Sequence, residues 1–217
     1  MSLDAAFAIA SGGLTNVSRQ LGVVSQNVSN ANTTGYTKEV GQQTAVDSGG
    51  EPMGVRTGIT QRSVDAALQD ESRQQDATVA ALDVRSTALS AIDAAHGTPG
   101  NSNDLASLTT ALSDAFSTLT STPSLASAQS AAVTAASALT DGINRVANSI
   151  TTQRQSAQDS LVDEVAQLNT SLSTIGTLAT QIQNETNAGE STATLEDQRD
   201  AAEETVAKLT GANFQQQ

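Results

Sequence analysis

The sequence has no cysteine and is poor in aromatic residues, proline and positive charge. Without cysteine the chain can form neither a disulfide framework nor a thiolate site. One tyrosine, three phenylalanines and no tryptophan in 217 residues make a thick globular core hard to build. The three prolines are compatible with long uninterrupted helices. Long helices that share narrow apolar seams need little bulk, so the composition favours a thin helical protein.

Long apolar runs are also missing. No stretch approaches the ~18 residues that a membrane-spanning helix needs, and the N-terminus lacks the basic flank and apolar segment of a cleavable secretory signal. The formal net charge is −13, of which residues 61–217 carry −12 (19 acids against 7 bases). A chain this acidic, without a basic stripe, is a poor candidate for nucleic-acid binding. Residues 1–60 are nearly neutral, as expected for a segment that packs among other copies or neighbours.

What the chain does have is periodicity near its N-terminus. Apolar residues recur there with alternating spacings of four and three, the heptad seam of a helix that packs along another helix. The members of this seam are Leu3, Phe7, Ala10, Leu14, Val17, Leu21, Val24 and Val28. Ser2 is the expected N-cap, and the run from Asn30 to Gly35 ends the helix. Burying the seam yields about 15 kcal/mol at most, so we expect the helix to be marginal alone and to become ordered on a partner.

Glycines punctuate residues 38–62, which predicts a loop with weak strand or hairpin character. Further helices are expected from about Ser63 to His96, over 105–119, from Pro123 to about 188, and over 195–209. Thr122 is the predicted N-cap of the longest helix, and Thr194 with Asp197 the predicted capping box of the last. The first part of the longest seam follows Ala132, Ala136, Leu139, Ile143, Val146, Ile150, Gln153 and Ala157. The seam then slips by one residue at Leu161, which changes supercoiling.

These patterns predict a mainly α protein, an elongated bundle of long coiled-coil-like helices with a short Gly-rich loop or β-hairpin near residues 38–62. Three regions follow from the same patterns. Residues 1–37 form an N-terminal helix and turn, residues 38–62 a Gly-rich connector, and residues 63–217 a long-helix rod domain.

Few residues offer the chemistry of an active site. His96 is the only histidine, stands at an expected helix C-terminus, and cannot form a conventional zinc site without cysteine. The charges of Glu196–Asp200 are expected to form ion pairs on a helix surface, because the alternative, a paired-carboxylate active site, requires a pocket. The glycines of 41–60 match no phosphate-binding loop, and the acids of 47–51 match no calcium loop. We therefore predict no catalytic residue, no metal, no cofactor and no enzymatic activity.

The stretch from Val24 to Thr37 resembles the N-terminal signature of bacterial flagellar rod, hook and hook-associated proteins. The residues that carry this resemblance are Asn27, Asn30, Asn32, Thr34, Gly35 and Tyr36. Gly54–Asp65 is similar to the segment that leads into the first long helix of the hook-associated protein 1 family, the hook–filament junction proteins. That family's Leu-x-Asp-Gln-Arg-Asp motif is matched by Leu195, Asp197, Gln198, Arg199 and Asp200.

The resemblance implies a structural subunit of the bacterial flagellum at the hook–filament junction, with terminal helices lining the axial channel. It implies an extracellular location reached through the flagellar type III export apparatus, with a chaperone and without a cleavable signal. Its partners would be other copies of itself, the hook protein and a second junction protein. Family members end in a second heptad helix that pairs with the first. Because the sequence stops before such a helix, we expect an N-terminal fragment or a truncated gene product.

Two other interpretations stay open. The first is another flagellar axial protein (hook, rod or flagellin), although hook and rod proteins normally continue into β-rich domains and flagellin lacks the Asn-Thr-Thr-Gly-Tyr run. The second is a coiled-coil adaptor or signalling module, since Ala/Ser/Thr-rich helical rods also occur in chemoreceptors. A receptor of that kind would need a membrane span.

Overall fold

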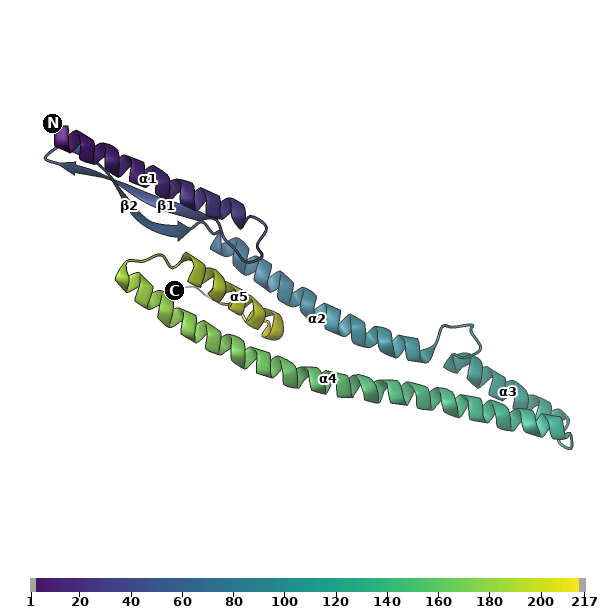
Figure 1. Cartoon of the computed structure of the whole chain (residues 1–217). Coiled ribbons are helices and arrows are strands. Elements are labelled where there is room, and N and C mark those ends of the chain that lie inside the picture. Colours follow the sequence, from purple (N-terminus) through teal and green to yellow (C-terminus); the bar gives the residue numbers. More distant parts are fainter. Residues whose placement is uncertain (1–2, 215–217) are drawn as a thin grey trace. The chain divides into compact units, whose positions relative to one another are not determined.

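A computed structural model describes residues 3–214 (Figure 1). This part of the chain contains five helices and one two-stranded sheet, which confirms the predicted mainly α class and the hairpin near residues 38–62. The elements are α1 (Leu3–Ser29), β1 (Glu39–Ser48), β2 (Glu51–Arg62), α2 (Ala66–His96), α3 (Leu105–Ser121), α4 (Ala126–Ala188) and α5 (Ala193–Thr210). Ser2, the predicted N-cap of α1, lies outside the described residues.

The chain divides into two compact units. One holds the residues up to Thr78 and those from Ala166 onward, and the other holds Val79–Val165. The predicted phase slip at Leu161 falls close to this boundary in α4. Within residues 3–214, no helix combines the length and the apolar character that crossing a bilayer would require.

The hairpin is longer than the sequence suggested. Its antiparallel strands meet at a two-residue turn, Gly49-Gly50, in which both residues have positive φ (63° and 85°). Such tight turns require positive φ at both positions, which only glycine adopts without strain. The register shifts between Gly41 and Gln43 and again between Val46 and Asp47. These irregularities interrupt the alternation of side chains, which explains why the pattern showed only short strand fragments. Helix α1 lies against both strands (Figure 1).

Several helix ends differ from the predictions. Helix α2 begins at Ala66 rather than Ser63, and the Asp65 carboxylate accepts the Leu68 N–H at 3.1 Å. Thr122 does not cap α4: it closes α3 by donating its N–H to Thr118 O at 3.0 Å, and α4 begins at Ala126. His96 ends α2 as predicted, with its Nδ1 2.9 Å from Ile92 O.

The unit of residues 79–165 is built by close packing of small residues. Buried positions include Leu108 on α3 and Ala128, Ala132 and Val146 on α4. The predicted seam is only partly buried: Gly142 packs inward while the adjacent Ile143 remains 53% exposed, and Ile150 and Ala157 are exposed as well. A Cβ on Gly142 would lie only 2.8 Å from Leu108 Cδ1, so the close approach of α3 to α4 requires glycine here.

Threonine hydroxyls along α4 bond to their own helix. Each donates to the carbonyl four residues earlier, over 2.8–3.0 Å. The residues that do so are Thr134, Thr140, Thr151, Thr170, Thr174, Thr177 and Thr180. Their hydroxyls are therefore satisfied locally, and their methyl groups remain for packing.

Candidate assembly site

Helix α1 is held to the hairpin by one face. Ile9 approaches the strand at Gly54, where an added Cβ would lie 3.9 Å from its side chain. Asn16 is only 6% exposed, and its Oδ1 accepts a hydrogen bond from the Thr57 hydroxyl at 3.1 Å. Small and polar contacts of this kind fix α1 on the hairpin without using its main apolar row.

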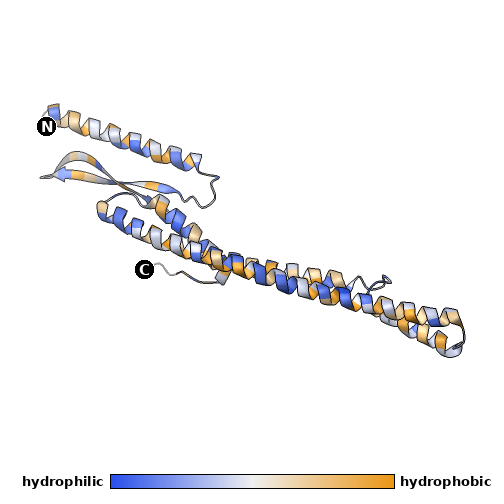
Figure 2. Cartoon of the chain, turned by 60° about the horizontal axis from the view of Figure 1, so that its bottom comes forward, coloured by the Kyte–Doolittle hydropathy of each residue, from blue (hydrophilic) through white to orange (hydrophobic). Residues whose placement is uncertain are grey.

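The predicted heptad seam lies on a different face, about a third of a turn away at 100° per residue. We call this seam the N-terminal stripe. Its exposed fractions are 87% for Leu3, 76% for Phe7, 70% for Leu14, 51% for Val17, 65% for Leu21, 55% for Val24 and 71% for Val28, and Ala10 is exposed as well. Figure 2 shows hydrophobic (orange) bands recurring along α1. A row of large apolar side chains in water is an interaction surface in most proteins that show one.

The end of α1 is tied to the hairpin through one amide side chain. Asn27 Oδ1 accepts the Glu39 N–H at 2.8 Å and the Tyr36 hydroxyl at 2.9 Å, while Nδ2 donates to Glu39 O at 2.9 Å. All of these partners lie within the turn and the first strand residue. Asn27 thus fixes the direction in which the chain leaves α1, the sharp turn that the signature predicted. Burial, and the charge of Asp197, raise the pKa of Glu39.

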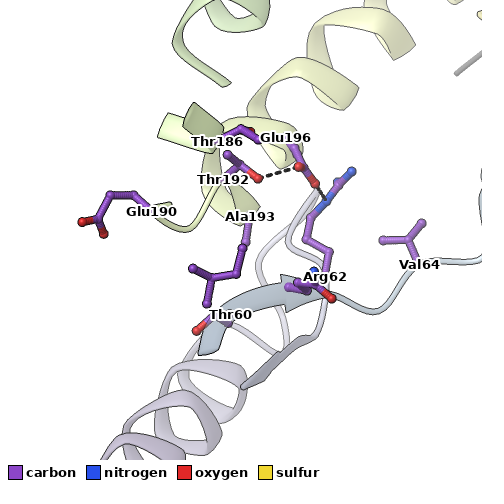
Figure 3. A pocket seen from close by; sticks show the side chains of 10 residues that line it. Thr60, Arg62, Val64, Thr186, Glu190, Thr192, Ala193 and Glu196 are labelled. Carbon is purple, nitrogen blue, oxygen red and sulfur yellow. Dashed lines mark hydrogen bonds and ion pairs between the residues drawn. The ribbon is translucent and has the colours of Figure 1, made fainter. Parts of the chain in front are cut away.

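Beyond this turn, the base of the hairpin meets α5 through a group of charges that we call the Arg62 clamp: Thr37, Arg62, Glu196, Asp197 and Asp200. Asp197 accepts the Thr37 N–H at 3.0 Å and the Thr37 hydroxyl at 2.6 Å. Arg62 donates from Nε to Glu196 at 2.7 Å, and from Nη1 to Asp197 at 2.9 Å and Asp200 at 2.7 Å. Figure 3 shows the link from Arg62 to Glu196, with Glu190 pointing away from it.

A second arginine extends the network to α2. Arg73, 7% exposed, donates to Glu203 at 2.9 Å and also contacts Asp70. Gln69 Nε2 donates to Asp200 at 2.8 Å. Arg199 lies 3.2 Å from both Asp200 and Glu203. Charges on α2 and α5 therefore interlock along their shared face.

Two predictions about α5 are wrong. The charges of Glu196–Asp200 are not simply pairs on a helix surface, because Asp197 and Asp200 are only 8% and 6% exposed and bind Arg62 from the hairpin. Thr194 and Asp197 form no capping box: the N-cap position belongs to Thr192, whose hydroxyl donates to Glu196 at 2.6 Å. The Asp197 carboxylate instead accepts hydrogen bonds from Thr37 and Arg62, which are distant in the sequence.

The buried carboxylates of α5 respond to the network in opposite directions. Burial raises the pKa of Asp200, but hydrogen bonds from Arg62 and Gln69 outweigh it, so the pKa is lowered overall. Burial raises the pKa of Glu203, and the attraction of Arg199 and Arg73 only partly offsets this. Burial lowers the pKa of Arg62, but the hydrogen bonds and negative charges of Asp200, Asp197 and Glu196 outweigh it, so the pKa is raised and Arg62 stays charged.

The structure brings most signature residues together and gives them structural partners. Asn27, Tyr36, Asp197, Arg199 and Asp200 belong to the contacts above, Asn30 Nδ2 donates to Gln26 O at 3.1 Å, and Gly35 supplies a positive φ of 82°. Asn32, Thr34 and Gln198 are exposed, and Leu195 is half-buried. Sequence reasoning missed the roles of Thr37, Arg62, Gln69 and Arg73. Arg62 lies within the Gly54–Asp65 segment noted for its resemblance, which was the available signal.

Comparison with known families was decisive for identity. The family model of the flagellar hook-associated protein FlgK helical domain matches residues 89–217. The chain belongs to this family. A second family model, that of the flagella basal body rod protein, matches residues 7–37, which comprise most of α1 and the turn after it. Comparisons with curated proteins and with solved structures gave no significant match.

Membership of the hook-associated protein family makes the chain a flagellar axial structural protein. The family forms part of the extracellular flagellum, serves motility, and is not a family of enzymes. Within residues 3–214, the acidic and histidine side chains form no group suited to hold a metal ion. The network around Arg62 is a structural joint between the hairpin and the helices α2 and α5.

Proposed function

We propose that the chain is a structural subunit of the hook–filament junction and that it joins its neighbours through the N-terminal stripe. The observation that carries this proposal is the exposure of the stripe. Seven large apolar side chains stay 51–87% exposed although another face of α1 is already packed on the hairpin. Heptad spacing fits a helical partner, such as α1 of another copy.

The charge distribution supports the same role. Residues 1–60 carry four acids and three bases, a net charge of −1, whereas residues 61–217 carry −12. Copies that meet through their N-terminal segments avoid most of the repulsion between acidic bodies. We propose residues 1–37 as the axial, channel-lining part, residues 38–62 as the connector and residues 63–217 as the rod domain.

The partners in this proposal are further copies of the chain, the hook protein and the second junction protein. The flagellar type III export apparatus and a chaperone would act on the chain before assembly, and secretion would not use a cleavable signal. A rod subunit is the second candidate, favoured by the family match over residues 7–37. The match to the hook-associated helical domain over 89–217 favours the junction.

The test uses the full chain with Leu14→Ser and Leu21→Ser combined, two stripe residues that are 70% and 65% exposed. Sedimentation velocity over a range of concentrations, alone and with purified hook protein, measures association. We expect the wild type to associate and the double variant to remain monomeric. Leu68→Ser is the matched control, because Leu68 is 68% exposed on α2, outside the stripe. Equal association of the wild type and the double variant would contradict the role of the stripe. Binding to rod proteins but not to hook protein would favour the second candidate.

A further inference from the structure

Helix α1 and the hairpin behave geometrically as one body, which we call the arm (residues 3–62). The helix lies against both strands. The hydrogen bond between Asn16 and Thr57 ties the middle of α1 to β2, and Asn27 ties its end to Glu39 on β1. Contacts at both positions resist sliding or tilting of α1 against the hairpin.

The arm is joined to the rest of its unit by one short chain segment, residues 63–65, which has no regular secondary structure. The chain enters β1 after Lys38 and leaves β2 before Ser63, and the Ser63 N–H donates to Lys38 O at 2.8 Å. A single short connection of this kind can serve as a hinge, because the arm can rotate about it with changes in only a few backbone dihedral angles.

The contacts that hold the arm against α5 are mainly polar. They are the bonds of Thr37 and Arg62 to the α5 carboxylates, and a bond from the Ser191 hydroxyl to Thr60 O at 2.9 Å. Ala193, the apolar α5 residue in the cavity beside Arg62, has only one methyl group to bury. When a polar joint separates, water can form hydrogen bonds with the exposed groups. When a packed apolar core separates, the exposed side chains gain no such compensation.

We propose that the arm swings as a rigid body about residues 63–65, and that Arg62 is the latch that holds it against α5. Arg62 suits this role because its side chain is only 7% exposed and binds the carboxylates of Glu196, Asp197 and Asp200, which lie within little more than one turn of α5. Removing the guanidinium leaves Asp197 and Asp200 without their main counter-charge and removes most of the contact at once. This inference does not depend on the proposed position at the hook–filament junction.

The experiment measures distances between spin labels in the full chain, which has no native cysteine to interfere. One label pair, Arg19→Cys with Gln198→Cys, spans the joint between α1 and α5. The other, Arg19→Cys with Thr44→Cys, lies within the arm. The three labelled positions are exposed in the structure, and none belongs to the stripe. The labelled chain is diluted with excess unlabelled chain, which removes the spin–spin distances between associated copies.

In the wild type we expect narrow distance distributions for both pairs. Arg62→Gln should broaden the α1–α5 distribution about twofold or more and leave the distribution within the arm unchanged. Thr37→Val, which removes one bond of the joint, should broaden it less. Arg154→Gln is the control, because Arg154 is an exposed arginine of the other unit. Circular dichroism establishes that each variant keeps its helices.

Two results would overturn the proposal. If Arg62→Gln leaves the α1–α5 distribution narrow, Arg62 is not the latch. If the distribution within the arm broadens together with it, α1 and the hairpin do not move as one body. Neither result depends on binding to hook protein, so failure of the latch is distinguishable from failure of the junction role.

Discussion

Thr37 donates its hydroxyl to Asp197 over 2.6 Å, although the two residues are 160 positions apart in the sequence. Thr37 ends the N-terminal signature stretch, and Asp197 belongs to the segment that matches the Leu-x-Asp-Gln-Arg-Asp motif. The two motifs are therefore two halves of one joint. Direct bonds thus connect the turn rich in asparagine and threonine near the N-terminus with the acidic start of α5.

The bond between these residues gives the first prediction. Thr37→Val keeps the shape of the side chain and the backbone donor but removes the hydroxyl that serves Asp197. Because hydrogen bonds to charged groups contribute more than neutral ones, we expect the free energy of unfolding to fall by about 1.5–3 kcal/mol. Urea denaturation measures this change. Thr34→Val is the control, since Thr34 is exposed, and it should stay within about 0.5 kcal/mol of the wild type.

The pair of Arg73 and Glu203 gives the second. Both residues are 7% exposed, so Arg73→Met leaves a buried carboxylate with only Arg199 nearby, and we expect a loss of about 3 kcal/mol. Replacing both residues with methionine should cost less than Arg73→Met alone, because no charge is then left uncompensated. Lys208→Met breaks the exposed pair with Glu204 and should cost at most about 1 kcal/mol. A double variant as unstable as the sum of the two single variants would show that the pair is not coupled.

The contact between α3 and α4 gives the third. In Gly142→Ala the new methyl would lie 2.8 Å from Leu108 Cδ1 and 3.1 Å from Leu105 Cδ2, so both leucines must shift. Overpacking of this kind costs about 1–3 kcal/mol, which exceeds the gain in helix propensity. Gly176→Ala in the same helix meets no atom within 4 Å and should stabilise by about 0.5–1 kcal/mol. Thermal unfolding of the two variants should therefore shift the melting temperature in opposite directions.

The fourth concerns pH. The pKa of Glu203 is raised in the folded chain, so this group stabilises the fold most below its unfolded pKa of about 4.3, and the contribution declines as pH rises through the folded pKa. Asp200 has a lowered pKa and acts in the opposite sense: its contribution is present above about pH 3.9 and is lost in stronger acid. Urea denaturation of Glu203→Gln across this range should show that its free energy of unfolding increases relative to that of the wild type as pH rises. The free energy of unfolding of Asp200→Asn should fall furthest below that of the wild type at neutral pH and approach it in acid. Parallel profiles for both variants and the wild type would refute this assignment.

Sequence reasoning worked where structure is decided locally. The periodicity of apolar residues and the positions of glycine fixed the helices to within a few residues, and His96 ends α2 as predicted. Both kinds of signal act within a few turns of helix. The N-terminal stripe could be predicted for the same reason, since its eight members follow one alternating spacing of four and three residues.

The failures involve partners that are distant in the sequence. Asp197 looked like part of a capping box until Thr37 and Arg62, at separations of 160 and 135 residues, were seen to occupy it. Gly142 escaped notice because it has no side chain to contribute to an apolar pattern, yet it is the position where α3 and α4 touch. Local patterns cannot show which distant group will compete for a carboxylate, or where two helices come closest.

The threonine side chains of α4 interact with water differently before and after folding. As an extended polypeptide, each hydroxyl is available to solvent, and the segment is as hydrophilic as its letters suggest. Once the helix closes, seven of these hydroxyls turn back onto their own carbonyls and leave methyl groups outermost. In the folded α4 these threonines therefore present more apolar surface than their hydropathy suggests.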